Sequence, residues 1–438
     1  MTKVLKFGGT SVGSAENMRK VAQIITDEKS RVTVLSAMSE TTNGLVRICK
    51  NGAEGVLDTE SLTYLRTKYE KCVSELLKNK DEAVAKIDSV FNYIKSQAVN
   101  YNSLSENNII AQGELLTTAI FTMYLKEIGL DAVLINVPDY MHTDVDGKAD
   151  SDYLERTLGK IVTSGNSSIF YITQGFICQN NDGLLDNLGR GGSDYSAALI
   201  GAAIGAKEVQ IWTDIDGMHN NDPRYVENTY PIRKMSFTQA AELAYFGAKI
   251  LHPSTIQPCK KYGIAVRLKN TLDASAPGTL ITNDESCDDQ KYRAVAAKDD
   301  ITVIRICSAR MLMAYGFLRQ VFEVFEKHKT PIDMITTSEV AVSLTIDNNT
   351  HIDSIIADLE PFGNVSYEES NTIICVVGNI PQQQSGLTAR ILDCITDIPI
   401  KMISYGASSH SMAFLIDSKS KISALQQLNR HLFENENR

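Results

Sequence analysis

A lysine, two glycines and two hydroxyl side chains follow one another in the sequence KFGGTS at positions 6–11. Gly8 and Gly9 allow backbone N–H groups to approach an oxygen closely. The helix expected after them adds partial positive charge at its N-terminus, and Lys6 supplies a full charge. The pattern therefore predicts a turn that holds an anion. Taken alone, such a stretch is more often a simple turn between a strand and a helix.

A second glycine-rich stretch, LGRGGSDYSAA, occupies positions 188–198. Ser193 or Asp194 suits the N-cap of the helix that should follow, which is the structural explanation for both. Capping does not explain Arg190, whose planar guanidinium stands in a flexible turn and suits a two-pronged grip on a carboxylate. This stretch predicts a second anion-binding turn.

The other candidate side chains also follow predicted strands or open predicted helices. Glu114 is favourable at a helix N-terminus whatever else it does, so its structural explanation is strong. The remaining candidates are Thr42 in SAMSETTN (36–43), Thr213 and Asp214 in WTDIDG (212–217), Arg224 in NDPR (221–224) and Lys249 in FGAKILHP (246–253).

The elements that must position these residues read as an α/β fold. Short β-branched runs at 32–35, 133–135, 169–172 and 209–212 alternate with helical patterns, such as the stripe Met18, Val21, Ala22 and Ile25. Continuous apolar strands are typical of a largely parallel sheet with helices on both faces. Ligands of such sheets bind beyond the carboxyl ends of the strands.

Three further regions complete the predicted organisation. Residues 58–102 are helical in pattern, rich in charge and free of Gly and Pro, which indicates a helical insertion, and the polar stretch 270–289 is expected to be a linker. Residues 293–438 repeat with a period of about 70, since Ile332 corresponds to Ile400 and Asp347 to Asp417. We expect domains at 1–292 and 293–438, the second made of two βαββαβ (ferredoxin-like) units that bind ligands, dimerise the protein, or do both.

Composition excludes several classes of protein. The 438 residues carry a formal net charge of −10 and no basic run, which argues against a nucleic-acid partner. No apolar stretch approaches the roughly 20 residues of a membrane span. The eight cysteines lack Cys-x-x-Cys spacing, so neither disulfides nor a metal site is predicted, and a cytoplasmic location is expected. The P-loop sequence is absent.

In order and spacing, these motifs resemble those of the aspartokinases, members of the amino-acid-kinase family. The stretches at 335–340 and 405–410 look most like the monofunctional, lysine-sensitive type, and the C-terminal units resemble a pair of ACT domains. The resemblance implies a three-layer catalytic domain of amino-acid-kinase type. It also implies transfer of the γ-phosphoryl group of ATP, with Mg²⁺, to the side-chain carboxylate of L-aspartate, giving 4-phospho-L-aspartate at the first step of lysine, threonine and methionine (diaminopimelate) biosynthesis.

The resemblance also implies a role for each candidate. Lys6 and the amides of Gly8 and Gly9 would face the transferring phosphoryl group, and Asp194 would orient the cationic groups. Arg190 would hold the substrate α-carboxylate and Glu114 its ammonium, with hydrogen bonds from Thr42 and Ser193. The nucleotide would be lined by Thr213, Asp214, Arg224 and Lys249, with His219 where this family often carries a tyrosine.

For regulation, the resemblance implies inhibition by L-lysine, bound between the first ACT units of a homodimer, which can pair further into a tetramer. The pocket would be formed by Met311, Phe317, Leu318, Asp333, Thr337, Ser338 and Glu339.

Three alternatives remain open from the residues. One is a related kinase acting on glutamate, carbamate or a nucleotide, which would need a different grip from that of Arg190 and Glu114. Another is a catalytically silent amino-acid sensor, against which Lys6, Arg190 and Asp194 speak. The third is an oligomerisation module, which would not need the loop residues.

Overall fold

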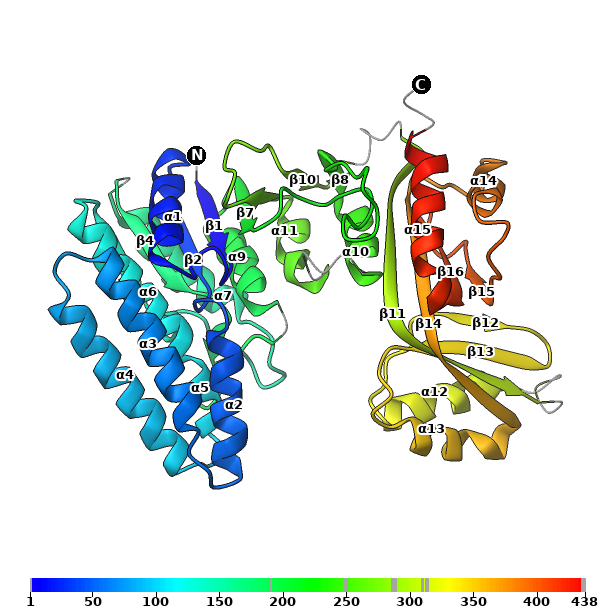
Figure 1. Cartoon of the computed structure of the whole chain (residues 1–438), viewed down its shortest axis with the longest axis horizontal. Helices are drawn as coiled ribbons and strands as arrows, with labels where there is room; N and C mark the ends of the chain where they lie inside the picture. The colour runs from blue at the N-terminus through cyan, green and yellow to red at the C-terminus, as the bar shows by residue number, and fades with distance from the viewer. Residues whose placement is uncertain are drawn as a thin grey trace. The chain divides into compact units, whose positions relative to one another are not determined.

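The computed structural model describes residues 2–166, 168–189, 191–247, 251, 253–284, 290–308, 311 and 315–434. The chain divides into two compact units (Figure 1). The first comprises residues 1–218, 233–237 and 251–284, and the second comprises 219–232, 238–250 and 285–438. Among the helices that are described, none combines the length and the apolar character needed to cross a membrane.

The first unit is built on an eight-stranded sheet in the order β3-β4-β2-β1-β7-β9-β10-β8. All neighbours are parallel except β9 and β10, which confirms the predicted largely parallel α/β sheet. A small hairpin, β5-β6, lies outside it. The strands are β1 (Lys3–Phe7), β2 (Val32–Leu35), β3 (Ala132–Ile135), β4 (Phe170–Gln174), β5 (Ile177–Gln179), β6 (Leu185–Asn187), β7 (Glu208–Thr213), β8 (Lys234–Ser236), β9 (Ala265–Asn270) and β10 (Thr279–Thr282).

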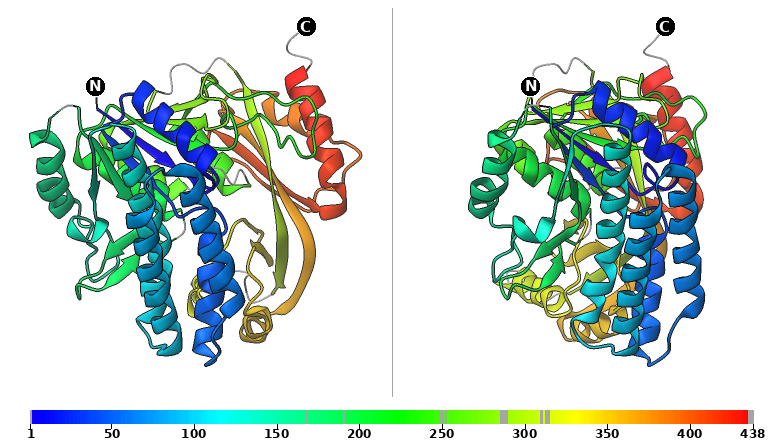
Figure 2. Two further views of the ribbon diagram at one scale, coloured as in Figure 1. Left: turned by 60° about the vertical axis from the view of Figure 1, so that its left-hand side comes forward. Right: turned by 90° about the vertical axis from the view of Figure 1, so that its left-hand side faces the viewer.

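Helices complete this unit. The predicted apolar stripe of the first helix is buried, with Met18, Val21 and Ile25 fully inaccessible. Residues 58–102 contain the long helices α3 and α4, which lie beside α2 in Figure 2 and share one apolar core with α1 and α6. The helices are α1 (Ala15–Asp27), α2 (Thr41–Ala53), α3 (Thr59–Leu76), α4 (Asp81–Val99), α5 (Ser105–Ile110), α6 (Gln112–Glu127), α7 (Ser151–Leu154), α8 (Lys160–Ser164), α9 (Gly192–Ala203) and α11 (Gln257–Tyr262).

The stretch 270–289 is not simply a linker, so that prediction was wrong. Residues 279–282 form β10, which pairs antiparallel with β9 and parallel with β8. Gly278 makes the turn possible: its φ is +68°, and a Cβ there would lie 1.8 Å from the carbonyl oxygen of Leu268. The strand has only four residues, and the polar turn residues before it led to the prediction of a linker.

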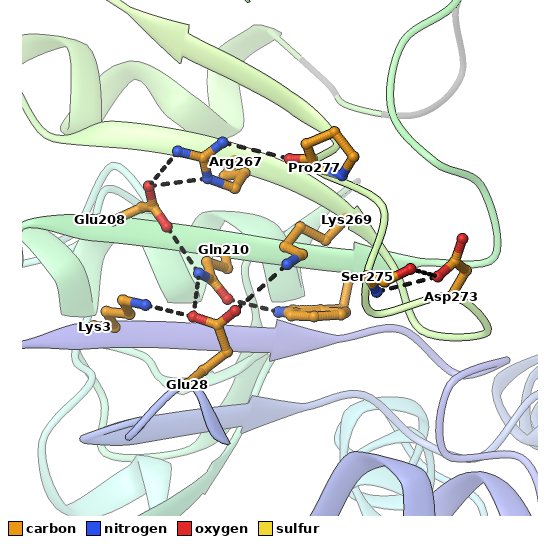
Figure 3. A network of polar contacts seen from close by, with 10 residues as sticks. Lys3, Glu28, Glu208, Gln210, Arg267, Lys269, Asp273, Ser275 and Pro277 are labelled. Carbon is orange, nitrogen blue, oxygen red and sulfur yellow. Dashed lines mark hydrogen bonds and ion pairs between the residues drawn. The ribbon is translucent and has the colours of Figure 1, made fainter. Parts of the chain in front are cut away.

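A network of charges crosses one face of β1, β7 and β9 (Figure 3). Glu28, just after α1, accepts hydrogen bonds from Lys3, from Gln210 (3.0 Å) and from Lys269 (3.4 Å). Burial acts to raise the pKa of Glu28, but these donors outweigh it and hold the pKa below its usual value. Lys269 also lies 4.8 Å from the ring centroid of Trp212. The network ties α1 to the three strands and supports their register.

The second unit contains a six-stranded antiparallel sheet in the order β12-β13-β11-β14-β16-β15. Its elements after α10 (Phe237–Tyr245) are β11 (Tyr292–Cys307), α12 (Phe317–Lys327), β12 (Ile335–Thr337), β13 (Ala341–Ile346), α13 (Ile352–Leu359), β14 (Asn364–Gly378), α14 (Leu387–Asp393), β15 (Met402–Ser404), β16 (Ser411–Asp417) and α15 (Lys421–Asn429).

The two predicted βαββαβ units are present, but they are nested instead of consecutive. The second half of β11 pairs with β13, while its first half pairs with the part of β14 that pairs with β16. Two separate apolar cores result: one contains Ile304 and Ile355, and the other contains Val295, Ile374 and Phe414. The later unit therefore takes one strand from sequence that precedes the earlier unit.

The nested arrangement predicts that Val295→Ala destabilises the later unit, although Val295 lies in the first half of β11, before the helices of the earlier unit in the sequence. The side chain is 2% exposed, and truncating it removes about 1 to 3 kcal/mol of unfolding free energy. Amide hydrogen exchange should quicken in β14 and β16. Unchanged protection of Phe414, with faster exchange only in β13, would contradict the nested arrangement.

Candidate active site

The carboxyl ends of β1, β2 and β7 bring together most of the predicted catalytic residues of the first unit. β1 lies between β2 and β7: the next strands in the chain, β2 to β4, lie on one side of it, and the strands from β7 to β10 lie on the other. Such a reversal opens a crevice at the carboxyl ends of the strands, where ligands of open α/β sheets bind. Lys6 lies at the end of β1, and Thr213 is the last residue of β7.

Lys6 and Asp194 form an ion pair at this edge. The Lys6 Nζ lies 2.8 Å from Asp194 Oδ1, and the two side chains are only 11% and 13% exposed. Asp194 stands in the first turn of α9. Removing either partner would leave a largely buried charge unpaired, which is costly. The pairing holds the Lys6 ammonium in place, as a preorganised cation for a developing negative charge requires.

Neither Ser193 nor Asp194 caps α9, so the structural explanation of these residues was wrong. The N-cap is Gly191, with φ of +70°. The Ser193 hydroxyl instead accepts a hydrogen bond from the Ser36 hydroxyl at 3.0 Å, which joins α9 to the end of β2. Gly175, after β4, permits this approach because a Cβ there would lie 2.6 Å from that of Ser193.

Glu114 lies in the first turn of α6 and is 3% exposed. Its Oε1 accepts a hydrogen bond from the Ala37 N–H at 3.2 Å, whereas Oε2 is buried and has no partner among the residues that the structure describes. Burial raises the pKa of Glu114 to about 7. A buried carboxylate oxygen without a donor favours binding of a cation, and an ammonium group supplies both the charge and the hydrogen bond.

The glycine turn differs from the prediction at one point. The Gly8 N–H donates to the carbonyl of Trp212 at 3.3 Å, so this amide is committed to the sheet and does not face a phosphoryl group. Gly8 lies beside Lys6: a Cβ there would lie 3.7 Å from the Lys6 Nζ, in ordinary van der Waals contact. Gly9 packs against β2, where a Cβ would lie 2.8 Å from the carbonyl oxygen of Ala37.

The predicted nucleotide residues fall in different units. In the first, the Thr213 hydroxyl accepts from the Ile215 N–H at 3.3 Å, and Asp214 is exposed. In the second, His219 Nδ1 lies 3.0 Å from the Thr229 hydroxyl, and Arg224 pairs with Asp222 at 2.9 and 2.6 Å while 70% exposed. The Arg224 guanidinium thus keeps part of its fork accessible.

Two predicted residues, Arg190 and Lys249, lie outside the residues that the structure describes. Thr42 is half-buried as the second residue of α2. The sequence analysis missed Ser36, Ala37 and Gly175 as individual contributors. Each lies within three residues of the end of a predicted strand, so the rule that ligands bind beyond strand ends was the available signal.

The residues predicted for lysine lie around α12 and the β12–β13 turn. Phe317 is buried at the start of α12 and Leu318 is exposed, while Met311 packs against the same core. Thr337 and Ser338 line a cavity of about 480 Å³ together with residues of β15, and Glu339 is exposed. Asp333 does not line this cavity: its side chain is 1% exposed and pairs with Lys298.

The structure describes seven of the eight cysteines. Cys49, Cys72, Cys178, Cys259, Cys375 and Cys394 are buried and unpaired, and Cys307 is exposed.

Comparison with known proteins agrees with this geometry. Residues 1–270 match the amino acid kinase family, and residues 374–432 match the ACT domain. Fold and site thus define an amino acid kinase joined to ACT units. Lysine-sensitive aspartokinase 3 of Escherichia coli (strain K12) is 33% identical over 448 residues, which span 98% of this chain and 99% of its own.

Two solved structures of E. coli aspartokinase III are also similar. The complex with aspartate and ADP has a TM-score of 0.87 at 32% identity, covering 99% of this chain and 100% of the other. The complex with lysine and aspartate has a TM-score of 0.81 at 32% identity, covering 99% of each. The chain belongs to the aspartokinases, which confirms the family that its motifs indicate.

The raised pKa of Glu114 predicts a pH-dependent penalty in the free enzyme. The folded state holds this proton up to about pH 7 and the unfolded chain only to about 4.5, so folding stability falls as pH rises between those values. Above pH 7 the penalty is constant, at about 3 kcal/mol. Glu114→Gln should therefore unfold at higher urea concentration than the parent at pH 8, while the two converge near pH 4.5.

Saturating aspartate should reverse this order at pH 8, because only the parent offers a charged partner to the substrate ammonium. A Glu114→Gln protein that is less stable than the parent at pH 8 without ligand would show that the carboxylate is stabilised by its surroundings.

Proposed function

We propose that the protein transfers the γ-phosphoryl group of ATP to the side-chain carboxylate of L-aspartate, giving ADP and 4-phospho-L-aspartate. The observation that carries the proposal is the buried Glu114 oxygen, which has no partner among the described residues and lies at the same sheet edge as the Lys6–Asp194 pair. Such a site suits a substrate that has both an ammonium group and a reacting carboxylate. The similar E. coli enzyme crystallised with aspartate and ADP supports this substrate class.

The chemistry needs positioning and positive charge more than acid–base catalysis. The substrate carboxylate is ionised at neutral pH and needs no general base. One of its oxygens attacks the γ-phosphorus, a new P–O bond forms, and the bond to the β-phosphate oxygen breaks. Lys6 offsets the charge that two approaching anions bring together, while Asp194 fixes its ammonium.

Arg190, Thr42 and Ser193 complete the proposed substrate grip. Gly189 and Gly191, the neighbours of Arg190 in the sequence, have φ values of +72° and +70°, which residues other than glycine rarely adopt. In the proposal its guanidinium holds the α-carboxylate, and the hydroxyls of Thr42 and Ser193 donate hydrogen bonds to the amino acid.

The assignment of Thr213, Asp214, His219, Arg224 and Lys249 to the nucleotide rests on the family resemblance. Mg²⁺ would be carried chiefly by the phosphates, since it keeps several waters and few protein ligands. It would supply charge neutralisation, and the exposed Asp214 carboxylate is of the oxygen-donor type that it prefers. We place the reaction in the cytoplasm, at the first step of lysine, threonine and methionine biosynthesis.

Lys6→Met is expected to abolish turnover and leave the fold intact. Loss of one preorganised charge contact at the transition state typically costs about 3 kcal/mol or more, a fall in kcat of about a hundredfold or greater. The measurement is coupled ADP release, with circular dichroism as the control for folding. Lys6→Arg should recover part of the activity. A folded Lys6→Met protein with near-normal kcat would remove Lys6 from the mechanism.

For regulation, we propose that residues 293–438 bind L-lysine and form a homodimer, with 1–292 as the catalytic domain. The first ACT unit presents three exposed apolar side chains: Tyr315 just before α12, and Leu318 and Phe322 one helical turn apart on α12. The three residues of β12 at the edge of the sheet are exposed as well. Both features suit self-association, and the similar E. coli structure with lysine and aspartate supports the effector.

Thr337→Ile is expected to keep activity and lose the response to lysine. Thr337 is exposed, so the larger apolar side chain should obstruct the pocket with little effect on folding. The measurement is the lysine concentration that halves ADP release, in parent and variant at equal aspartate. An exposed apolar control is Thr350→Ile, on the turn before α13. Equal sensitivity of Thr337→Ile and the parent would place the effector elsewhere.

A further inference from the structure

Asp333 cannot meet an external ammonium group without a rearrangement. Its side chain is 1% exposed. Oδ1 accepts a hydrogen bond from the Tyr245 hydroxyl at 2.8 Å and from the Lys298 ammonium at 2.6 Å. Oδ2 is buried and has no partner among the described residues. An effector ammonium that binds Oδ1 must therefore displace Tyr245, Lys298 or both.

Two carboxylates hold Lys298 in place, so an external ammonium displaces it less readily than it displaces a neutral hydroxyl. Asp347 lies 2.9 Å from the Lys298 Nζ and is partly exposed. Tyr245 is a neutral donor that contacts Asp333 through a single hydrogen bond, and its ring centroid lies 4.7 Å from the same ammonium. Burial, and then the charge of Asp333, raise the pKa of Tyr245, so the hydroxyl stays protonated and acts as the donor.

Tyr245 is the last residue of α10, and the chain beyond it is held against β11 at a neighbouring point. Gly247 has φ of +129°, and a Cβ there would lie 2.0 Å from the carbonyl oxygen of Ala297, the residue before Lys298. The segment 245–247 is thus fixed to β11 both through the Asp333–Lys298 pair and through Gly247. In sequence, Lys249 of the proposed nucleotide group follows two residues later.

We propose that Tyr245 is the positioning residue that passes the occupancy of Asp333 by an external ammonium to the segment following α10. The inference rests on the lysine regulation proposed above and adds the residue that carries it. Without lysine, Tyr245 holds this segment through Asp333. With lysine, the effector ammonium replaces the hydroxyl, and the segment loses that tether. Asp333 is the shared group of a two-state element, which is what coupling between sites requires.

The proposal predicts the direction in which loss of the Tyr245 hydroxyl changes lysine sensitivity, which a contact without a role in regulation would leave unchanged. The Tyr245 hydrogen bond exists only in the lysine-free state, so its loss should favour the lysine-bound state. A hydrogen bond to a charged group is stronger than one between neutral groups, but exposure to solvent weakens this one in part. Tyr245→Phe should therefore be inhibited at about a threefold or more lower lysine concentration.

The experiment compares the full-length parent, Tyr245→Phe and the control Tyr367→Phe, which removes a hydroxyl from an exposed position in β14. ADP release is measured against lysine at fixed ATP and aspartate, and calorimetry gives the lysine affinity independently. We expect Tyr245→Phe to keep kcat without lysine within about twofold, to bind lysine more tightly, and to shift the inhibition curve by the same factor. Tyr245→Leu should shift in the same direction, and Tyr367→Phe should match the parent.

Unchanged or weaker lysine sensitivity in Tyr245→Phe, with the parent inhibited normally, overturns the role of Tyr245 and leaves the proposed lysine regulation standing. A parent that neither binds lysine nor is inhibited by it overturns the regulation itself, and this inference with it. Equal shifts in Tyr245→Phe and Tyr367→Phe would also overturn it, because the effect would then be unspecific.

Discussion

The catalytic edge depends on holding a lysine ammonium still where two anions must meet. The Lys6–Asp194 pair does this at 2.8 Å, largely out of water. The pair spans two elements that are distant in sequence, the end of β1 and the first turn of α9. The close contacts around it, such as Gly9 on β2 and Ser193 on Ser36, keep those elements in register. The polar network of Glu28 on β1, β7 and β9 stabilises the same strands on the sheet face that packs α1.

Glu114 complements the Lys6 ammonium by offering a negative charge to the substrate. The enzyme buries a carboxylate with one oxygen unpartnered among the described residues, and this burial raises the pKa of Glu114 and costs stability at neutral pH. A substrate ammonium would neutralise that charge and recover the cost on binding. Asp333 is buried in a similar way in the ACT sheet, but there the chain's own Lys298 supplies the ammonium. Glu114 would thus pair with a cation of the substrate, whereas Asp333 already pairs with a cation of the chain itself.

Much of this was accessible from sequence because it follows from local patterns. The strand at 32–35 was predicted at its observed bounds, and the apolar stripe of α1 is buried as expected. What failed depends on contacts distant in sequence. Strand β10 is defined by its pairing with β8 and β9. In the first turn of α9, Asp194 and Ser193 contact Lys6 and Ser36 and do not cap the helix. The nested ACT units depend on the pairing of β11 with β14. The burial of Glu114, which sets its pKa, likewise comes from tertiary packing.

The most direct test of the account is the choice of acceptor. ADP release should be measured with L-aspartate, L-glutamate, succinate and no acceptor, with hydroxylamine present to trap an acyl phosphate as the hydroxamate. The account predicts turnover and hydroxamate with L-aspartate, and at most a small fraction of that rate with succinate, which lacks the ammonium group that Glu114 would bind. Equal turnover with succinate, or with L-glutamate, would contradict it.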